Sequence, residues 1–521
     1  MTKQTKQTFI KGAMILLVAG ILTRVLGFIP RIALPRIIGA EGVGLYQLSY
    51  PFLSVLLTVI TGGIPLAVSK WIAEAESQGN HRRVKQIFGT AMSLVIILAL
   101  IMTCALLLLA PWITKHILPD SRVYYSFLSM APVLLIIGVS SVYRGYFQGK
   151  QNMIPGALSQ VIETIIRIIA SIAFSFMLLP YGLAWAAAGA MIGVVAGEIG
   201  GLAVLFWKAK QQRRHDKQMH QQAEKAADRK EPVLRRLLGL SIPVTAHRMV
   251  GSLSYLLESI LTARSLAAAG IATGIATSQY GALQGMIVPL LLLPTALTYS
   301  LAVSLVPSLS EAAARNDRPL IHKRLHQSMR ISLVAGAPFV VVMTLFAEPL
   351  CRLLYNHAEI APMLKLMAPI GLFIYLQAPL QASLQALDKP GAALTNTLIG
   401  AIVKLVLIIN LASQPSLGIY GALIAINVNI VLVTVLHAIS VLRYLGFRMK
   451  GLDFIKVGAA MIIMGGAASW IMNQRLLTFE WINMLLACFI SIIIYLLLMI
   501  VMKIIDRHDV ARIPLLGQWF K

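Results

Sequence analysis

Long apolar runs recur from one end of this chain to the other, and each holds about 18 or more residues with almost no charge. A helix of that length crosses a hydrocarbon core of about 30 Å. Because the core holds no water, the backbone groups of each run must be satisfied within its own helix. The alternating pattern of membrane β-strands is absent from the runs. The chain is therefore predicted to be an all-α integral membrane protein with about fourteen transmembrane helices.

Composition agrees with this prediction, because only 12% of the residues are charged and a soluble domain carries about 25%. The spans cover about 12–38, 46–69, 87–109, 126–147, 154–179, 183–207, 237–263, 280–306, 330–347, 363–386, 393–411, 419–442, 454–473 and 481–503.

The connections between the spans alternate between basic and nearly uncharged. One set, which includes both termini and the long stretch 208–236, holds most of the 45 Lys and Arg residues. The opposite set contains only Lys115, Arg122, Arg352, Lys365 and Arg475. Positive loops stay in the cytoplasm. We therefore expect both termini to be cytoplasmic, an even number of spans, and a multi-pass protein of the cell (inner) membrane.

Short sequences recur in the two halves of the chain in the same order. Arg24–Gly27 in the first span corresponds to Arg248–Gly251 in the seventh, and Pro155 corresponds to Pro390. The recurrence predicts duplication of a six-span unit. Because six is even, both copies insert with the same orientation and are related by a pseudo-twofold axis along the membrane normal.

The duplication and the long polar stretch 208–236 together predict the domain organisation. We expect two six-helix lobes, followed by two C-terminal helices outside the repeat. The predicted segments are an N-lobe with spans 1–6 at residues 1–207, a cytoplasmic linker at 208–236, a C-lobe with spans 7–12 at 237–445, and spans 13 and 14 with a cytoplasmic tail at 446–521.

Ionisable residues inside the predicted spans are the main candidates for function. A charge near the bilayer centre costs a few kcal/mol, so such a residue normally faces the bundle interior or an aqueous cavity. Basic residues outnumber acidic ones in this set, and three repeat-related pairs are Arg24 with Arg248, Arg36 with Arg264, and Arg167 with Lys404. The full set is Arg24, Arg31, Arg36, Glu163, Arg167, Glu198, Arg248, Glu258, Arg264 and Lys404.

We rank these candidates by their depth in the predicted spans and by whether they have a repeat-related partner. We predict a cationic substrate-binding cleft formed by Arg24, Arg31, Arg248 and Arg264, while the others are candidates for the cleft or for coupling. Alternatives remain open for several residues. Arg31, Arg36 and Arg264 could reach the interface instead, Glu163 and Arg167 are four apart and could form a structural ion pair, and Glu258 could neutralise Arg264.

Prolines within the first and seventh spans are candidate hinges. Pro30, Pro35 and Pro243 each remove a backbone hydrogen-bond donor, which loosens the preceding helical turn. We expect these helices to bend as a cleft opens.

Catalytic and metal-binding patterns are not found in the sequence. The chain contains no P-loop, no GxSxG and no HExxH. The pair His322 and His326 lies in a predicted cytoplasmic loop without a carboxylate or Cys framework, which favours a solvated face over a metal site. We expect a protein that is not an enzyme and that uses neither a cofactor nor a metal.

Several motifs carry a resemblance to a known family. The segments Thr23–Phe28, Ile38–Tyr46 and Gly63–Lys70 resemble the opening of polysaccharide-export flippases, which belong to the multidrug/oligosaccharidyl-lipid/polysaccharide superfamily. More specific are Tyr143–Asn152 and Ser304–Ala312, together with Pro379–Ala386, which resemble the sporulation branch of these proteins. The resemblance extends over nearly the whole chain and is thinner over spans 13 and 14.

The resemblance implies a fourteen-span, two-lobed transporter that works by alternating access and serves synthesis of the spore cortex, a peptidoglycan. Related lipid II flippases carry essential arginines in the first span, in a context similar to that of Arg24 and Arg31. They also carry basic residues in the second span. Here that span, Tyr46 to Ser69, has no charge. The cationic residues of the predicted cleft therefore differ from the set found in lipid II flippases.

The favoured function is a flippase for an undecaprenyl-pyrophosphate-linked sugar, such as a lipid II-like precursor of cortex peptidoglycan. Arginine binds phosphate oxygens bidentately and stays charged when it is buried. One alternative is a multidrug or cation antiporter, which would favour a carboxylate-rich cavity. Another is a scaffold that recruits wall-synthesis proteins without transport. The expected partners are the lipid-linked substrate, membrane lipids and possible wall-synthesis proteins, and no nucleic acid.

Overall fold

The computed structural model describes residues 9–219, 232–474 and 477–504, and all regular elements in these ranges are helices. The chain divides by its internal contacts into two compact units, Met1–Met286 and Ile287–Lys521. Each unit is described by itself below. Residues 220–231 of the predicted linker and 505–521 of the predicted tail lie outside the described ranges.

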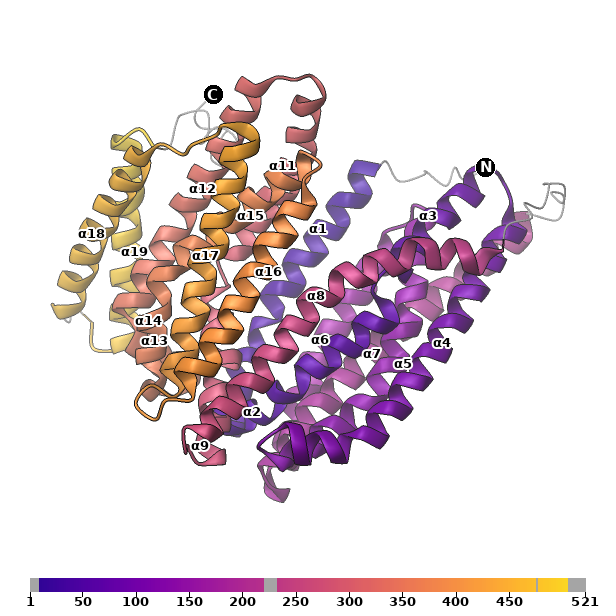
Figure 1. The fold of residues 1–521 in the computed structure, drawn as a ribbon, viewed down its shortest axis with the longest axis horizontal. Coiled ribbons are helices and arrows are strands. Elements are labelled where there is room, and N and C mark those ends of the chain that lie inside the picture. Colours follow the sequence, from indigo (N-terminus) through magenta and orange to yellow (C-terminus); the bar gives the residue numbers. More distant parts are fainter. Residues whose placement is uncertain (1–8, 220–231, 475–476, 505–521) are drawn as a thin grey trace. The chain divides into compact units, whose positions relative to one another are not determined.

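Unit 1 consists of nine α-helices with short π and 3-10 segments (Figure 1). They are α1 (Phe9–Leu26), α2 (Phe28–Thr61), α3 (Ile64–Ser77), α4 (His81–Trp112), η1 (Ile113–Ile117), η2 (Ser121–Val123), α5 (Tyr124–Gly149), α6 (Ile154–Leu178), η3 (Leu179–Tyr181), α7 (Leu183–Met219), α8 (Val233–Ala268), α9 (Thr273–Gly281) and, at the border, η4 (Ala282–Ile287).

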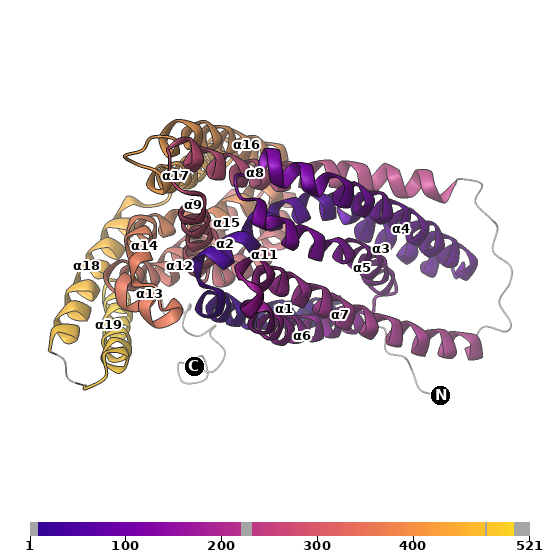
Figure 2. The ribbon, with the colours of Figure 1, turned by 90° about the horizontal axis from the view of Figure 1, so that it is seen from below.

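Unit 2 contains the remaining helices of the described chain, which Figure 2 shows from a second direction. They are α10 (Val288–Leu291), α11 (Thr295–Ala314), α12 (Arg318–Leu345), α13 (Ala347–Tyr355), η5 (Ala358–Ile360), α14 (Ala361–Met367), η6 (Ala368–Ile370), α15 (Gly371–Ala386), α16 (Pro390–Leu407), η7 (Ile408–Ala412), α17 (Ile419–Leu445), α18 (Gly451–Asn473) and α19 (Glu480–Val501).

The all-α membrane fold predicted from hydropathy is confirmed, and the number of fourteen spans is approximate. Within the described residues, 11 helical stretches are long and apolar enough to cross a membrane. One of them, Met14–Ser77, is 64 residues long and covers the first two predicted spans. The stretches do not include α8, which carries several charges, or the predicted eighth span, which is broken near Pro294 between α10 and α11.

Gly39 separates the first two predicted spans inside the continuous stretch of α2. Its φ of 65° and ψ of 179° are not helical, and two helical segments meet there. A positive φ favours glycine because a Cβ atom would clash with the backbone. The sequence-based end of the first span at residue 38 therefore coincides with this change of helix direction.

The contact-based division differs from the predicted domain borders. The helix α8 follows the predicted linker, yet it packs against α2 and α3 and belongs to unit 1. At its beginning, Arg236 forms an ion pair with Glu74 of 3.1 Å, and its guanidinium lies 3.9 Å from the centre of the Trp71 ring. The predicted N-lobe, linker and C-lobe concern the duplication and remain a prediction.

The helices α6 and α7 approach each other closely. A Cβ atom on Gly189 would lie 2.6 Å from the Phe174 carbonyl oxygen, so only glycine fits at this position. Hydroxyl groups bridge the same contact, since Ser171 Oγ donates to the Ala190 carbonyl at 3.0 Å. Small residues that allow close backbone contact and interhelical hydrogen bonds are typical of membrane interfaces.

Side-chain bonds to backbone oxygens also hold the core of unit 2. The Tyr375 hydroxyl donates to the Leu291 carbonyl at 3.0 Å, and the Tyr495 hydroxyl donates to the Val334 carbonyl at 3.1 Å. Both tyrosines are fully buried. The second bond attaches α19 to α12, so the last helix of the described chain is packed into this unit.

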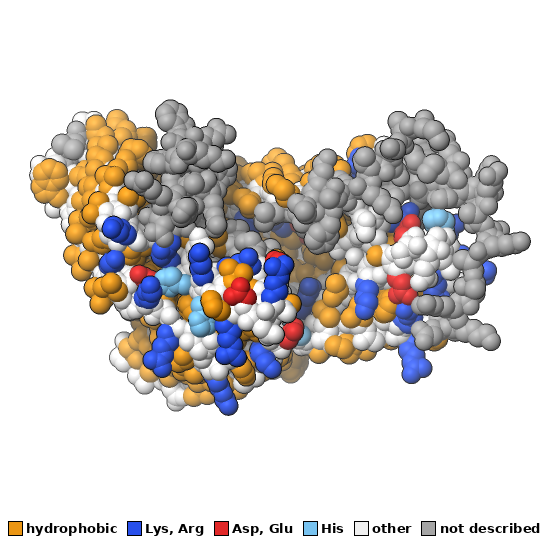
Figure 3. All heavy atoms as spheres, turned by 90° about the horizontal axis from the view of Figure 1, so that it is seen from above, with side chains coloured by type: hydrophobic (Ala, Val, Ile, Leu, Met, Phe, Trp, Pro, Cys, Tyr) orange, Lys and Arg blue, Asp and Glu red, His pale blue; other side chains and the backbone are white. Residues whose placement is uncertain are grey.

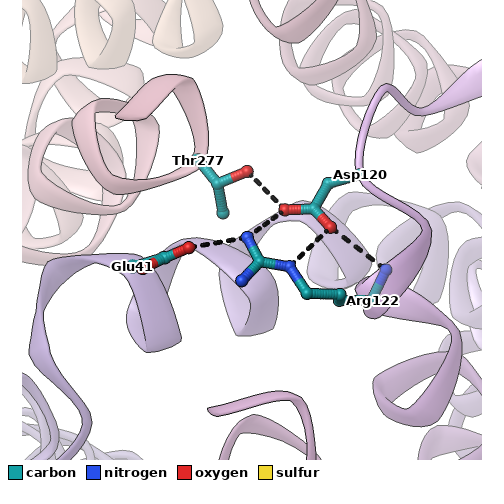
Figure 4. A network of polar contacts seen from close by, with 4 residues as sticks. All are labelled: Glu41, Asp120, Arg122 and Thr277. Atoms are coloured by element: carbon teal, nitrogen blue, oxygen red, sulfur yellow. Dashed lines mark hydrogen bonds and ion pairs between the residues drawn. The ribbon is translucent and has the colours of Figure 1, made fainter. Parts of the chain in front are cut away.

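An ionic network connects three segments of unit 1 near the end of α4 (Figure 4). The Arg122 guanidinium lies 2.8 Å from Asp120 Oδ2 and 2.6 Å from Glu41 Oε1. Thr277 Oγ1 of α9 donates to Asp120 Oδ2 at 2.8 Å. The network thereby joins α2, the α4–α5 connection and α9.

Hydrogen bonding sets the charge state of Asp120. Burial alone would raise the pKa of its carboxyl, but bonds from Arg122 and Thr277 outweigh burial and hold that pKa below its usual value. A carboxyl with a depressed pKa stabilises the folded state at neutral pH. This stability is lost as the pH falls below about 4, the unfolded value, and through the lower native pKa.

We predict that Asp120→Asn lowers the free energy of unfolding by about 1–3 kcal/mol at neutral pH, because the substitution removes a charge-assisted bond. The melting temperature of wild type in detergent should fall more steeply than that of the variant as the medium is acidified below about pH 4. Glu311→Gln, in the exposed pair with Arg315 of 2.8 Å, is the control and should have little effect. Equal acid dependence of wild type and Asp120→Asn would contradict the prediction.

Candidate functional site

The predicted intramembrane charges gather in unit 1. Lys404, buried in α16 of unit 2, is the one exception among the ten residues. Arg24 is exposed in the last turn of α1, and Arg36 is exposed in α2. Unit 1 therefore contains all four residues predicted for the cationic cleft.

Arg31 and Arg248 have uncommitted side chains. Both are exposed, and neither guanidinium makes an ion pair or hydrogen bond to any residue in the described part of the chain. Arg31 follows Pro30 in the first turns of α2, and Arg248 lies near the middle of α8. Because α2 and α8 pack together, these two cations belong to the same helix pair.

A cavity of about 190 Å³ lies between Arg248 and one face of α2. Hydroxyl groups make this face polar without charging it. Thr58 Oγ1 donates to the Ser54 carbonyl, and Thr61 Oγ1 donates to the Leu57 carbonyl, each at 2.8 Å. A hydroxyl that donates in this way keeps lone pairs that can accept from a ligand. The lining residues are Tyr50, Leu53, Ser54, Leu57, Thr58, Thr61, Gly62 and Arg248.

Tyrosines continue the polar face of α2 towards Arg31. The rings of Tyr46 and Tyr50 have their centroids 6.1 Å apart. Arg31 is one of the charged groups in the surroundings of Tyr46 and of Tyr255 of α8. The face that begins beside Arg31 thus ends at the cavity that contains Arg248.

Sequence reasoning missed this polar face because it searched for charges. A signal was available, since hydroxyl-bearing residues recur every four positions at Tyr46, Tyr50, Ser54 and Thr58. A spacing of four places side chains on one face of a helix. In a span without charge, such a row indicates an edge that faces polar groups rather than lipid.

Arg264 is bonded to the backbone. Its Nε donates to the Ile117 carbonyl at 3.0 Å, and its Nη2 donates to the carbonyl of His116. These carbonyls lie at the end of η1, where the helix leaves acceptors unsatisfied. Glu258 accepts from Gln284 Nε2 at 2.9 Å, and its neutralisation of Arg264 remains a prediction.

The ion pair predicted by the spacing of Glu163 and Arg167 is present, with 3.2 Å between Arg167 Nη1 and Glu163 Oε1. The sequence did not reveal a second partner, Arg144 of α5, which lies 2.7 Å from Glu163 Oε2. Glu198 of α7 is buried beside this cluster. These four side chains come from three helices of unit 1.

The candidate hinges lie within long helices. Pro35 is inside α2 and Pro243 is inside α8, whereas Pro30 lies in the first turn of α2, where a missing donor costs little. Bending at these positions remains a prediction.

The histidines of α12 contact groups of unit 2. His322 Nε2 lies 2.8 Å from the Leu445 carbonyl oxygen, and His326 Nε2 lies 3.2 Å from Asp453 Oδ2. No group of three or more His, Cys, Asp and Glu residues that could hold a metal occurs within the ranges that the structure describes.

Two protein families resemble parts of the chain. The family described as polysaccharide biosynthesis protein matches residues 9–313, and the MatE family matches residues 249–409. The structure of the lipid II flippase MurJ in an inward closed conformation superposes with a TM-score of 0.67 at 16% identity. That comparison covers 94% of this chain and 99% of MurJ, and it shows a shared fold.

Curated relatives extend over nearly the whole chain. Stage V sporulation protein B of Bacillus subtilis (strain 168) is 42% identical over 98% of this chain and 99% of its own length. The lipid II flippase MurJ of the same organism is 25% identical over 91% of this chain and 88% of its own length. The chain is a multi-pass membrane protein and belongs to the polysaccharide biosynthesis protein family, in which it is a relative of stage V sporulation protein B.

Proposed function

We propose that this protein is a flippase that moves an undecaprenyl-pyrophosphate-linked sugar across the membrane by alternating access, as a precursor of spore cortex peptidoglycan. The observation that carries the proposal is the pair of guanidinium groups of Arg31 in α2 and Arg248 in α8, which have no ion pair or hydrogen bond among the described residues, together with the polar cavity beside Arg248. The names of the relatives, a sporulation protein and a lipid II flippase, support the same substrate class.

The site has the chemistry of a lipid-linked diphosphate. A diphosphate carries at least two negative charges, and each guanidinium can bind phosphate oxygens with two parallel hydrogen bonds. The hydroxyls of Ser54, Thr58 and Tyr50 can bond the hydroxyl groups of a sugar. The cavity of about 190 Å³ is smaller than a typical ligand pocket, whose volume is at least about 300 Å³. It therefore fits part of the headgroup.

An antiporter of organic cations would need carboxylates that are free to bind the substrate. Near the candidate site, Glu41 is paired with Arg122 at 2.6 Å, and Glu258 accepts from Gln284 at 2.9 Å. The exposed charged groups that the structure describes at this site, Arg31 and Arg248, are instead cations. The positive charge of the site therefore favours an anionic substrate. Arg24, which is exposed in α1, is a further candidate for binding the headgroup.

Orientation in the cell membrane forms part of the proposal. Figure 3 shows Lys and Arg side chains gathered on the face that carries the α11–α12 and α17–α18 connections of unit 2. Anionic lipids and the positive-inside rule favour the cytoplasm for such a face. We therefore propose that both termini and residues 208–236 are cytoplasmic.

Reporter fusions test this orientation. Fusions after residues 219 and 521 should give signal only with a reporter that is active in the cytoplasm, while a fusion after Gln414, in the α16–α17 connection, should require a reporter active outside. A Lys208→Ala control should keep the same pattern, because the overall Lys and Arg excess sets orientation. An external signal after residue 219 would overturn the orientation.

Substitution of the two free arginines tests the substrate site. Arg31→Ala and Arg248→Ala should each weaken binding of undecaprenyl pyrophosphate to the purified protein by about ten- to a hundredfold, because a hydrogen bond to a charged group contributes about 1.5–3 kcal/mol. Arg248→Lys should restore part of the loss, since Lys keeps the charge without the bidentate geometry. Spores of the Ala variants should lack normal heat resistance.

Two matched variants separate binding from folding. Arg315→Ala changes an exposed arginine that is paired with Glu311 and should leave binding unchanged. Arg264→Ala removes bonds to the η1 carbonyls and should lower the abundance of the protein more than the affinity of the remaining molecules. Wild-type binding by a stable double variant of Arg31 and Arg248 would exclude this site and favour the scaffold function.

A further inference from the structure

A second cluster of charged side chains lies inside the membrane-spanning part of unit 1. Its centre is the buried carboxylate of Glu163 in α6, whose side chain binds two arginines. Arg144 Nη2 lies 2.7 Å from Glu163 Oε2, and Arg167 Nη1 lies 3.2 Å from Glu163 Oε1. Each oxygen of this carboxylate thus has its own cation.

Glu198 of α7 is a second carboxyl in the same place. It is 5% exposed, and its Oε2 atom is buried without a hydrogen-bond partner among the described residues. The groups that act on it are Glu163, Arg144 and Arg167. A buried charged oxygen without a partner is costly, so this atom needs an explanation that the ion pairs of Glu163 do not supply.

The packing of α6 on α7 is close at the level of the two glutamates. A Cβ atom on Gly197 would lie 2.6 Å from Arg167 Cβ, and one on Gly201 would lie 3.0 Å from Glu163 Cβ. Ser159 Oγ donates to the Gly201 carbonyl at 2.9 Å. The helices cannot separate at this level without breaking these contacts, so the carboxyls stay together.

Two adjacent carboxylates repel each other, and a carboxylate can only accept hydrogen bonds. Glu198 Oε2 has no hydrogen-bond partner among the described residues, and Glu198 follows Gly197, which packs directly against the turn of α6 that carries Glu163 and Arg167. A hydrogen bond between the two carboxyl groups would require a proton on one of them. Both oxygens of Glu163 are occupied by arginines. We infer that Glu198 is a proton-binding site, in which a proton added to the carboxylate gives a carboxylic acid whose O–H donates to Glu163.

The surrounding charges distinguish a proton from a metal cation. With both carboxyls ionised, two negative and two positive charges cancel, and protonation of Glu198 leaves the cluster with one positive charge. The titratable and charged groups that face Glu198 are Glu163 and Arg167 of α6 and Arg144 of α5, with Tyr46 of α2 next to Arg167. A metal ion would lie against two guanidinium groups, whereas a proton is held within the carboxyl itself.

The arginines of the cluster extend to the surface of the molecule, whereas its carboxyl groups do not. The side chains of Arg144 and Arg167 are 25% and 32% exposed, while Glu163 and Glu198 are covered. Arg167 also acts on Tyr46, which belongs to the polar face of the proposed headgroup site. A proton on Glu198 therefore adds positive charge one helix away from that face, and it should strengthen binding of an anion there. This last link rests on the proposed function, but the proton site does not.

Infrared difference spectroscopy of the full-length protein in lipid nanodiscs tests the proton site without substrate. We expect a protonated-carboxyl band that disappears as the medium is made alkaline and that is absent from Glu198→Gln. Glu258→Gln is the matched control, because Glu258 is equally buried but accepts from Gln284, and it should keep the band. A titrating band that survives in Glu198→Gln, or no such band in wild type, overturns the inference.

Two further measurements keep the inference testable. If Glu198→Gln does not fold, Glu198→Asp should shift the band, and an unchanged band counts against Glu198. The melting temperature of wild type should depend on pH more steeply than that of Glu198→Gln, and the difference should correspond to the binding of one proton. Equal pH dependence of the two proteins would contradict a proton-binding site at Glu198.

Binding of undecaprenyl pyrophosphate separates this inference from the proposed function. Wild type should bind the probe more tightly in acid than in alkali, whereas Glu198→Gln should bind equally at both. Failure of wild type to bind the probe at any pH, together with a titrating Glu198 band, would remove the proposed substrate and leave the proton site in place. Binding with the same pH dependence in wild type and Glu198→Gln would overturn the link between the two sites.

Discussion

The hydrocarbon interior of a bilayer offers no hydrogen-bonding partner to a polar group, and this constraint explains most of the contacts inside the described helices. Backbone groups are satisfied within each helix, and buried side chains use the remaining carbonyl oxygens of neighbouring helices. Ser171 bonds the Ala190 carbonyl across α6 and α7, and Tyr495 bonds the Val334 carbonyl across α19 and α12. Charges follow the same rule, because Arg264 is bonded to the carbonyls that end η1. Arg31 and Arg248 depart from this rule within the described residues, and this departure is the basis on which they are proposed as a binding site.

Hydropathy and charge predicted those features that depend on the bilayer alone. The runs predicted helices, and the end of the first span coincides with Gly39, where a positive φ changes the helix direction. The break inside the eighth predicted span was beyond the sequence pattern, because its apolar run is continuous while the helix is interrupted near Pro294, between α10 and α11. The assignment of α8 to the first unit was also beyond the sequence, since it depends on contacts such as that between Arg236 and Glu74.

The site could be predicted only where its contacts are local in sequence. Glu163 and Arg167 are one helical turn apart, so their ion pair follows from spacing. Arg144 and Glu198 join the same cluster from α5 and α7, and no periodicity within one helix places them there. The search for intramembrane charges found Arg31 and Arg248 but not the hydroxyl row that begins at Tyr46, because a row without charge leaves hydropathy almost unchanged.

The absence of charge from the second predicted span then has a physical meaning. Arg31 precedes the polar face of α2, and Arg248 of α8 lies beside the far part of this face. The cations therefore come from the beginning of α2 and from the neighbouring helix α8. A diphosphate binds strongly to guanidinium groups, whereas neutral sugars are bound by hydroxyls that bring no charge of their own. If α2 itself carried a row of cations, other anions would compete for it. Under the proposed function, hydroxyls from Tyr50 to Thr61 would make affinity depend on a ligand that offers phosphate and sugar together, which would favour a lipid-linked sugar over free phosphate.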